Sequence, residues 1–284
     1  MHKLIKSSTV FVLVISIILL LSGCGAGQQS ASNDSSPAQN NEASSQDASK
    51  KAETVELTIS AAASLTDALK EIQHLYESNH PGLKLNFNFG GSGALEKQIE
   101  QGAPSDLFLS ASKKNMKSLV DQQLIESNKQ KKWLTNELVA VIPADGTMSI
   151  AGVTDLTQQE VKKVAIGIPE SVPAGKYAQE ALTNVKLWDT LQSKLVQAKD
   201  VRQVLQYVET GNADVGFVYK TDALTSQKAK IAFEVDPTTY SPVEYPIGIV
   251  KASKHIQEAE DFYAYLQSQE SLNIMAKYGF TIPK

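Results

Sequence analysis

The chain has 284 residues, of which 42% are hydrophobic and 20% are charged, so it is long and apolar enough to bury a core in two domains. It carries 27 Lys and Arg residues against 31 Asp and Glu residues, a formal net charge of −4 at pH 7. This acidic balance argues against nucleic acid as a partner. No cysteine follows Cys24, which excludes disulfides, zinc–thiolate sites and cysteine catalysis in the folded part.

The first 24 residues have the features of a bacterial lipoprotein leader. Lys3 and Lys6 give a positive start, and residues 10–21 form an apolar run too short to span a bilayer. Two small residues then precede Cys24, and this junction resembles the lipobox, where cleavage before the cysteine leaves a thiol that carries a diacylglyceryl group. The resemblance implies a signal peptide at 1–23 and a lipid anchor on Cys24 at the outer face of the cytoplasmic membrane.

Two other interpretations of this leader stay open: a secretory signal with an incidental cysteine, and an uncleaved anchor helix. Cleavage would remove Lys3 and Lys6 and so change the net charge from −4 to −6. Residues 24–52 contain no large apolar side chain and consist mostly of Ser, Gln, Asn, Ala and Asp. Such a composition cannot offset its ordering entropy, so we expect a disordered tether.

From residue 53 onward, short β-like runs alternate with helical periodicity, which predicts an α/β fold with mostly parallel sheets. Strands are predicted at 55–60, 83–89, 107–110, 138–142, 164–168, 215–219, 231–235 and 247–250. A helix is predicted from about Leu65, and it should stop before Pro81. Further helices are predicted at 94–100, 113–123, 176–182, 201–210 and 256–268.

Two predicted strand-to-helix corners combine small residues with a serine. The first strand leads into AAASLTD (61–67), where Ser64 and Asp67 have the spacing of a capping box. The second leads into GGSG (90–93), which places Ser92 near the next helix start.

Two further corners carry other helix-start signals. VPAG (172–175) puts a proline in the first turn, just before Ala174, and Asp200 can cap a helix that begins at Val201. None of the four corners has Lys or Arg at its tip. Ordinary capping explains each corner alone, but together they suit a small, fully ionised anion held by neutral donors.

Long segments of the chain resemble the ModA family, the molybdate-binding proteins of bacterial ABC importers, within the type 2 periplasmic-binding-protein fold. The resemblance covers essentially the whole folded region. The segments are AAASLTDALKEI (61–72), GGSGALEKQIEQGAPSDLFLSA (90–111), VAIGIPESVPAGKYAQEAL (164–182), DVRQVLQYVETGNADVGFVY (200–219), VEYPIGIV (243–250) and YGFTIP (278–283).

The resemblance implies five ligand-binding positions for the oxyanion. They are the hydroxyls of Ser64 and Ser92, the backbone amides of Ala174 and Val201, and the hydroxyl of Tyr219. Glycines flank Ser92 where some relatives have further hydroxyl residues, so additional hydrogen bonds are not expected there.

The resemblance also implies an architecture and a mode of action. The first lobe should consist of residues 53–136 plus 246–284, and the second of residues 137–245. Two crossing segments should join the lobes, which close over molybdate or tungstate. The protein should work as a monomer that delivers its ligand to a membrane permease. It needs no cofactor and no free metal cation, because molybdenum is bound as its oxyanion.

Other functions remain to be weighed. A site made only of donors disfavours hydrogen phosphate but not sulfate or another fully ionised oxyanion, and a lipid-anchored oxyanion sensor could use the same fold. A secreted serine hydrolase is disfavoured, because a nucleophile elbow needs glycines two residues before and two residues after the serine. Ser92 has Ala94 in the second of these places, and Ser64 lacks both glycines. His74, His80 and His255 lie in no catalytic motif.

Overall fold

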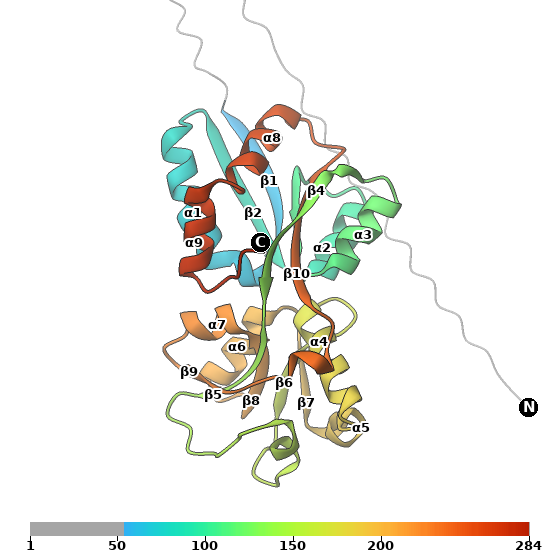
Figure 1. The fold of residues 1–284 in the computed structure, drawn as a ribbon, viewed down its shortest axis with the longest axis vertical. Helices are drawn as coiled ribbons and strands as arrows, with labels where there is room; N and C mark the ends of the chain where they lie inside the picture. Colours follow the sequence, from blue (N-terminus) through green and yellow to red (C-terminus); the bar gives the residue numbers. More distant parts are fainter. Residues whose placement is uncertain (1–53, 284) are drawn as a thin grey trace, which may run out of the picture. The chain divides into compact units, whose positions relative to one another are not determined.

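The structure, a computed structural model, describes residues 54–283 (Figure 1). The predicted leader, the tether and the lipid on Cys24 lie outside the described residues. Within 54–283, no helix combines the length and the apolar character needed to cross a bilayer.

The first of two sheets has five strands in the order β2-β1-β3-β10-β4. Strands β2, β1 and β3 pair in parallel, and β10 and β4 continue the sheet in antiparallel pairing. We call this sheet and its helices the first lobe (Figure 1). Its strands are β1 (Val55–Ala62), β2 (Leu83–Gly90), β3 (Leu107–Leu109), β4 (Ile125–Asn136) and β10 (Val243–Val250). Its helices are α1 (Thr66–Asn79), α2 (Ser92–Glu100), α3 (Lys113–Asp121), α8 (Ile256–Tyr265) and α9 (Gln269–Lys277).

The second sheet has the order β7-β6-β8-β5-β9, again parallel on one side and antiparallel on the other. With its helices it forms the second lobe (Figure 1). Its strands are β5 (Leu138–Pro143), β6 (Val164–Gly167), β7 (Leu195–Ala198), β8 (Val215–Tyr219) and β9 (Ala229–Glu234). Its helices are α4 (Pro173–Asn184), α5 (Trp188–Leu191), α6 (Val201–Glu209) and α7 (Lys220–Thr225).

The predicted α/β class is confirmed, and the parallel pairing expected for the sheets is found at the core of each. Strand β8 is buried at every residue, and β5 at all but the last. These strands were predictable because a strand covered on both faces is a continuous apolar run.

Strand β4 was not predicted, because it lies at the edge of its sheet and, after the buried Ile125, its first half is polar and mostly exposed. Edge strands commonly carry such residues, which discourage pairing with other chains. The predicted helix 256–268 was also wrong at its end. It stops at Tyr265, and Ser268 caps a separate helix, α9, by accepting from the Ser271 amide.

The chain passes from the first sheet to the second at Glu137, between β4 and β5, and returns between β9 and β10. Val243 at the start of β10 pairs with Asn136 at the end of β4, so the two passages lie side by side. The lobe boundaries given above from the sequence remain a prediction.

Candidate functional site

A small cavity lies between the lobes, where β1, β2 and β8 end and α4 and α6 begin. Measured for the centre of a water-sized sphere, its volume is about 10 Å³. This is far below the several hundred Å³ of pockets for organic ligands, so the cavity fits only a small ion or molecule. Its lining residues are Ala62, Ala63, Ser64, Gly90, Gly91, Ser92, Ala111, Val172, Pro173, Ala174, Val201 and Tyr219. All five residues predicted for the site are among them.

Ser64 lies in a short 3-10 turn, Ala63–Leu65, between β1 and α1. The predicted capping box with Asp67 is wrong, because neither the turn nor α1 has a side-chain cap. Instead, the Ser64 Oγ lies 2.8 Å from the hydroxyl of Tyr245 on β10. A long-range partner has therefore replaced the local one.

Ser92 is the first residue of α2 and is fully buried. Its Oγ accepts a hydrogen bond of 2.9 Å from the backbone amide of Ala111, the second residue after β3. With that acceptor position filled by a fixed N–H, the serine proton is free to point at a ligand in the cavity.

Helices α4 and α6 each direct an N-terminus at the cavity. Ala174 and Val201 are the second and first residues of these helices, so their amides have no acceptor within the helix. The predicted signals are confirmed here: Pro173 begins α4, and the Asp200 side chain caps α6 by accepting from the Gln203 amide. Both helix dipoles therefore favour negative charge in the cavity.

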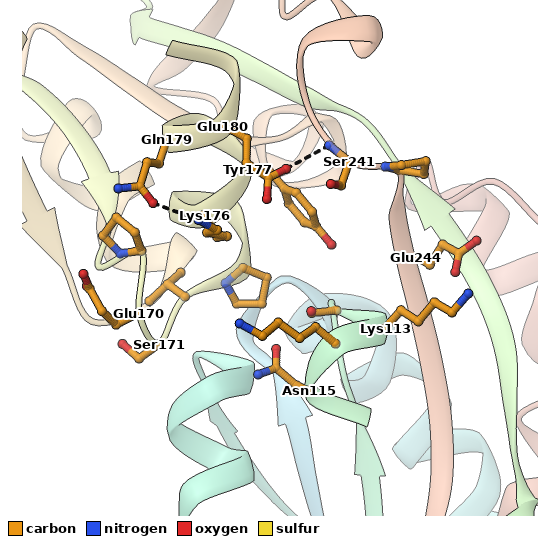
Figure 2. Close-up of a pocket in the computed structure, with 16 residues that line it drawn as sticks. Lys113, Asn115, Glu170, Ser171, Lys176, Tyr177, Gln179, Glu180, Ser241 and Glu244 are labelled. Atoms are coloured by element: carbon orange, nitrogen blue, oxygen red, sulfur yellow. Dashed lines mark hydrogen bonds between the residues drawn. The ribbon is translucent and has the colours of Figure 1, made fainter. Parts of the chain in front are cut away.

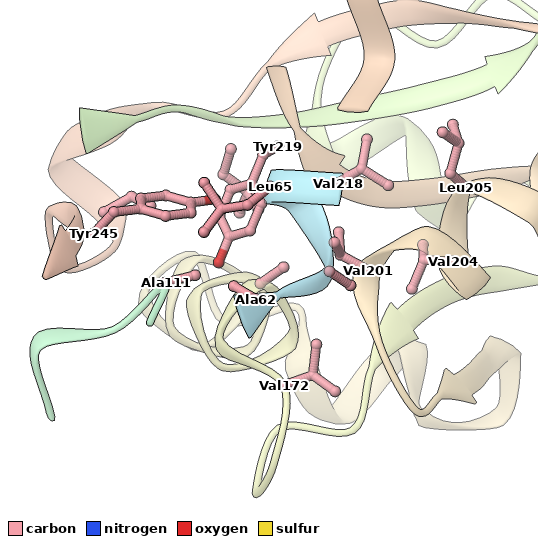
Figure 3. Close-up of a cluster of buried hydrophobic side chains, with 14 of the residues drawn as sticks. Ala62, Leu65, Ala111, Val172, Val201, Val204, Leu205, Val218, Tyr219 and Tyr245 are labelled. Atoms are coloured by element: carbon pink, nitrogen blue, oxygen red, sulfur yellow. The ribbon is translucent and has the colours of Figure 1, made fainter. Parts of the chain in front are cut away.

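Tyr219 ends β8 and is 1% exposed. Figure 3 shows its hydroxyl directed towards Ala62 and Ala111, which line the cavity. This hydroxyl is buried and has no hydrogen-bond partner among the described residues. Burial raises the pKa of Tyr219 well above its ordinary value, so the group is a neutral donor without an acceptor. An unpaired buried donor costs about 1–3 kcal/mol, so this hydroxyl is suited to donate to a ligand in the cavity.

The two lobes touch directly around the cavity. The Gly93 amide donates to the Ser171 carbonyl at 2.9 Å, and the Tyr177 hydroxyl donates to the Ala111 carbonyl at 3.3 Å. A Cβ on Gly93 would lie 2.9 Å from the Ser171 Cα. Glycine is therefore needed here for the lobes to approach this closely.

Arg202, next to Val201 on α6, ties the lobes together. Its Nη2 lies 2.6 Å from Asp67 Oδ2 on α1 of the first lobe. Its Nη1 lies 3.3 Å from Asp222 Oδ1 and 3.1 Å from Thr225 Oγ1, both on α7 of the second lobe. This bridge could not be predicted from the sequence, because Asp67 and Arg202 are 135 residues apart.

Replacing Asp222 with asparagine should remove a pH dependence of stability. Burial raises the pKa of Asp222 from 3.8 to about 6, although the positive charge of Arg202 acts to lower it. A raised pKa means that the folded state holds the proton more tightly. The contribution to stability is therefore complete below about pH 4 and is lost as the pH rises through 6.

Thermal unfolding between pH 4 and pH 8 checks this. Across that range, the free energy of unfolding of the wild-type protein should fall by roughly 3 kcal/mol relative to that of Asp222→Asn. Comparing the two proteins cancels the other carboxyl groups that titrate in both. Parallel stability curves would contradict the shifted pKa.

A larger groove of about 550 Å³ lies beside the cavity and shares Val172 and Pro173 with it (Figure 2). Its lining includes equal numbers of basic and acidic side chains. Residues 54–283 contain a few buried polar atoms without a hydrogen-bond partner, and none of them lies in this groove. The groove therefore has no preference for an anion. The charged residues are Lys113, Lys114, Lys176, Glu170, Glu180 and Glu244.

Two α/β lobes, joined by paired crossing strands and closed over a small cavity lined with donors, define a two-lobed solute-binding protein. The chain belongs to the family of bacterial extracellular solute-binding proteins, whose model matches residues 57–281. The predicted type 2 periplasmic-binding-protein fold and the resemblance to the ModA family are confirmed.

Three relatives illustrate the match. The putative ABC transporter substrate-binding lipoprotein YvgL of Bacillus subtilis is 47% identical over 276 residues, 97% of this chain and 98% of that protein. The molybdate-binding protein ModA of Haemophilus influenzae is 37% identical over 233 residues, 81% of this chain and 91% of that protein. The solved substrate-binding domain of a putative molybdenum ABC transporter from Clostridium difficile is 46% identical, with a TM-score of 0.62 over 81% of this chain and 100% of that chain.

Proposed function

We propose that this protein captures molybdate, and also tungstate, as a dianion in the interlobe cavity and delivers it to the permease of an ABC importer. The observation that carries the proposal is the Tyr219 hydroxyl, a buried donor with no partner in the described part of the chain, at a cavity edged by two serines and two helix N-termini. The names of the relatives from Haemophilus influenzae and Clostridium difficile support the choice of ligand.

In this proposal, five neutral donors hold the anion: the hydroxyls of Ser64, Ser92 and Tyr219 and the amides of Ala174 and Val201. No charged side chain lines the cavity, so the favourable field comes from the helix dipoles of α4 and α6 and from oriented hydrogen bonds. Closing the lobes removes water and strengthens each of these bonds. No bond of the ligand is made or broken.

We also propose that the leader is cleaved before Cys24 and that a lipid on this residue holds a monomer at the outer face of the cytoplasmic membrane. The YvgL match supports this, because that relative is named as a lipoprotein and the match covers 97% of this chain. Mass spectrometry of the protein from membranes should find the acyl chains on an N-terminal Cys24. A mature chain without lipid would overturn the anchor but not the ligand.

Thermal unfolding with molybdate, tungstate, sulfate and hydrogen phosphate tests the ligand. An anion at about 100 times its dissociation constant should add about 2.7 kcal/mol and raise the melting temperature by several degrees. We expect this shift with molybdate and tungstate. An equal shift with sulfate would make the protein a general binder of fully ionised oxyanions, and no shift with any anion would refute the proposal.

Ser92→Ala should lose most of the rise in melting temperature that molybdate causes, because it removes one donor to the anion and leaves the Ala111 amide unpaired. The control is Ser271→Ala on α9. Ser271 is also fully buried, and its hydroxyl has no partner within residues 54–283. This control should keep the full shift with molybdate.

A further inference from the structure

The hydroxyl of Tyr245 contacts Ser64, which lines the cavity, although Tyr245 itself does not line it. Tyr245 lies on β10, is fully buried, and packs its ring against Tyr219 at a centroid distance of 5.8 Å (Figure 3). Its hydroxyl is 2.8 Å from Ser64 Oγ and 3.4 Å from Asn136 Nδ2. Tyr245 does not line the cavity, and of the two residues that its hydroxyl contacts, Ser64 is the one that does.

The direction of these hydrogen bonds follows from Asn136. Its Oδ1 accepts from the Glu137 amide at 2.9 Å, which turns Nδ2 towards Tyr245 and towards Thr221 Oγ1, 2.9 Å away. An amide nitrogen can only donate, so the Tyr245 oxygen accepts from Asn136. The proton of Tyr245 then has one acceptor within reach among the described side chains, the Ser64 oxygen.

Ser64 consequently accepts a hydrogen bond from Tyr245, and its own proton must point elsewhere. Ser64 lines the cavity, so this proton is available to a ligand there. The chain of donors runs from Asn136 through Tyr245 and Ser64 to the cavity. Burial keeps this chain in place by raising the pKa of Tyr245 well above its ordinary value, so that the phenol stays protonated.

We propose that Tyr245 is a positioning residue that fixes Ser64 as a hydrogen-bond donor and thereby makes the cavity select fully deprotonated tetrahedral oxyanions over those that keep a proton. The inference rests on the proposed function. It assigns the selectivity to a side chain that does not touch the ligand. A backbone amide orients the Ser92 hydroxyl, and no side-chain substitution removes that amide. Ser64 is oriented by a side chain, so a substitution can change whether its hydroxyl donates or accepts a hydrogen bond.

Without the Tyr245 proton, Ser64 Oγ is free to accept a hydrogen bond. The Ser64 proton can then turn towards another oxygen. Ser64 Oγ can accept the proton of an anion such as hydrogen arsenate in a hydrogen bond, which it cannot do in the wild-type cavity. Molybdate, which has no proton to donate, gains nothing and loses a preoriented donor. The two ligands should therefore respond differently to the same substitution.

The experiment compares molybdate with hydrogen arsenate at pH 8 in the wild-type protein, in Tyr245→Phe and in the control Tyr76→Phe. Tyr76 is also buried, but it packs against Phe262 and Tyr265 of α8 and does not line the cavity. Molybdate affinity is titrated directly, and hydrogen arsenate is measured by its displacement of molybdate.

In Tyr245→Phe, the ratio of molybdate affinity to hydrogen arsenate affinity should fall about tenfold, with the control unchanged. A merely structural role would weaken the binding of both anions by the same factor. An unchanged ratio of the two affinities, with or without such a loss, would overturn the role of Tyr245. If the wild-type protein binds no molybdate, the proposed function itself fails. Binding by the wild type with an unaltered ratio in Tyr245→Phe refutes only this inference.

Discussion

Tyr219→Phe is expected to weaken molybdate binding by about 10- to 100-fold and, at the same time, to stabilise the ligand-free protein. The loss of affinity follows because the hydroxyl donates to a charged ligand, and such hydrogen bonds contribute about 1.5–3 kcal/mol. The gain in stability follows because the same hydroxyl is buried and has no partner among the described residues. Phenylalanine keeps the ring contact with Tyr245.

The two effects are measured separately, by calorimetric titration with molybdate and by chemical unfolding without it. We expect the free energy of unfolding of the ligand-free protein to rise by about 1 kcal/mol. Tyr76→Phe serves again as the control and should alter neither quantity in this way. An unchanged molybdate affinity in Tyr219→Phe would place the hydroxyl outside the ligand shell, and a less stable ligand-free protein would mean that the hydroxyl is already paired.

Gly175→Ala is expected to destabilise the second lobe by about 3 kcal/mol or more. A Cβ at this position would lie 1.9 Å from the carbonyl oxygen of Gly167 and 2.4 Å from its carbonyl carbon. Both atoms belong to the backbone of β6 and cannot rotate away. Helix α4 would have to move, and the Ala174 amide at its start would leave the cavity.

The measurement is the midpoint of chemical unfolding, followed by molybdate titration of the fraction that remains folded. Gly152→Ala is the matched control, because a Cβ there meets no atom within 4 Å and the φ of −173° is open to any residue. The control should keep both stability and affinity. If Gly175→Ala unfolds at the same midpoint as the wild type, the close contact between α4 and β6 is not needed for the fold.

The candidate site was partly predictable, because its local signals are strong. Pro173 and Asp200 mark helix starts in the sequence, and the structure has helices there with free amides directed at one cavity. Ser64 shows the limit of such signals. Its predicted partner, Asp67, is three residues away, whereas its actual partner, Tyr245, is 181 residues away.

The sequence by itself determined the class of fold, the family and the residue types at the five predicted positions. It could do so because buried strands, helix starts and close turns each impose a local pattern on neighbouring residues. Only the tertiary structure decided which distant groups pair: Tyr245 with Ser64 and the Ala111 amide with Ser92 inside the first lobe, and Arg202 with Asp67 between the lobes. Such pairs depend on strand order and on the approach of the two lobes, and no short segment of the chain encodes either. The same long-range packing leaves the Tyr219 hydroxyl buried and unpaired in the described structure.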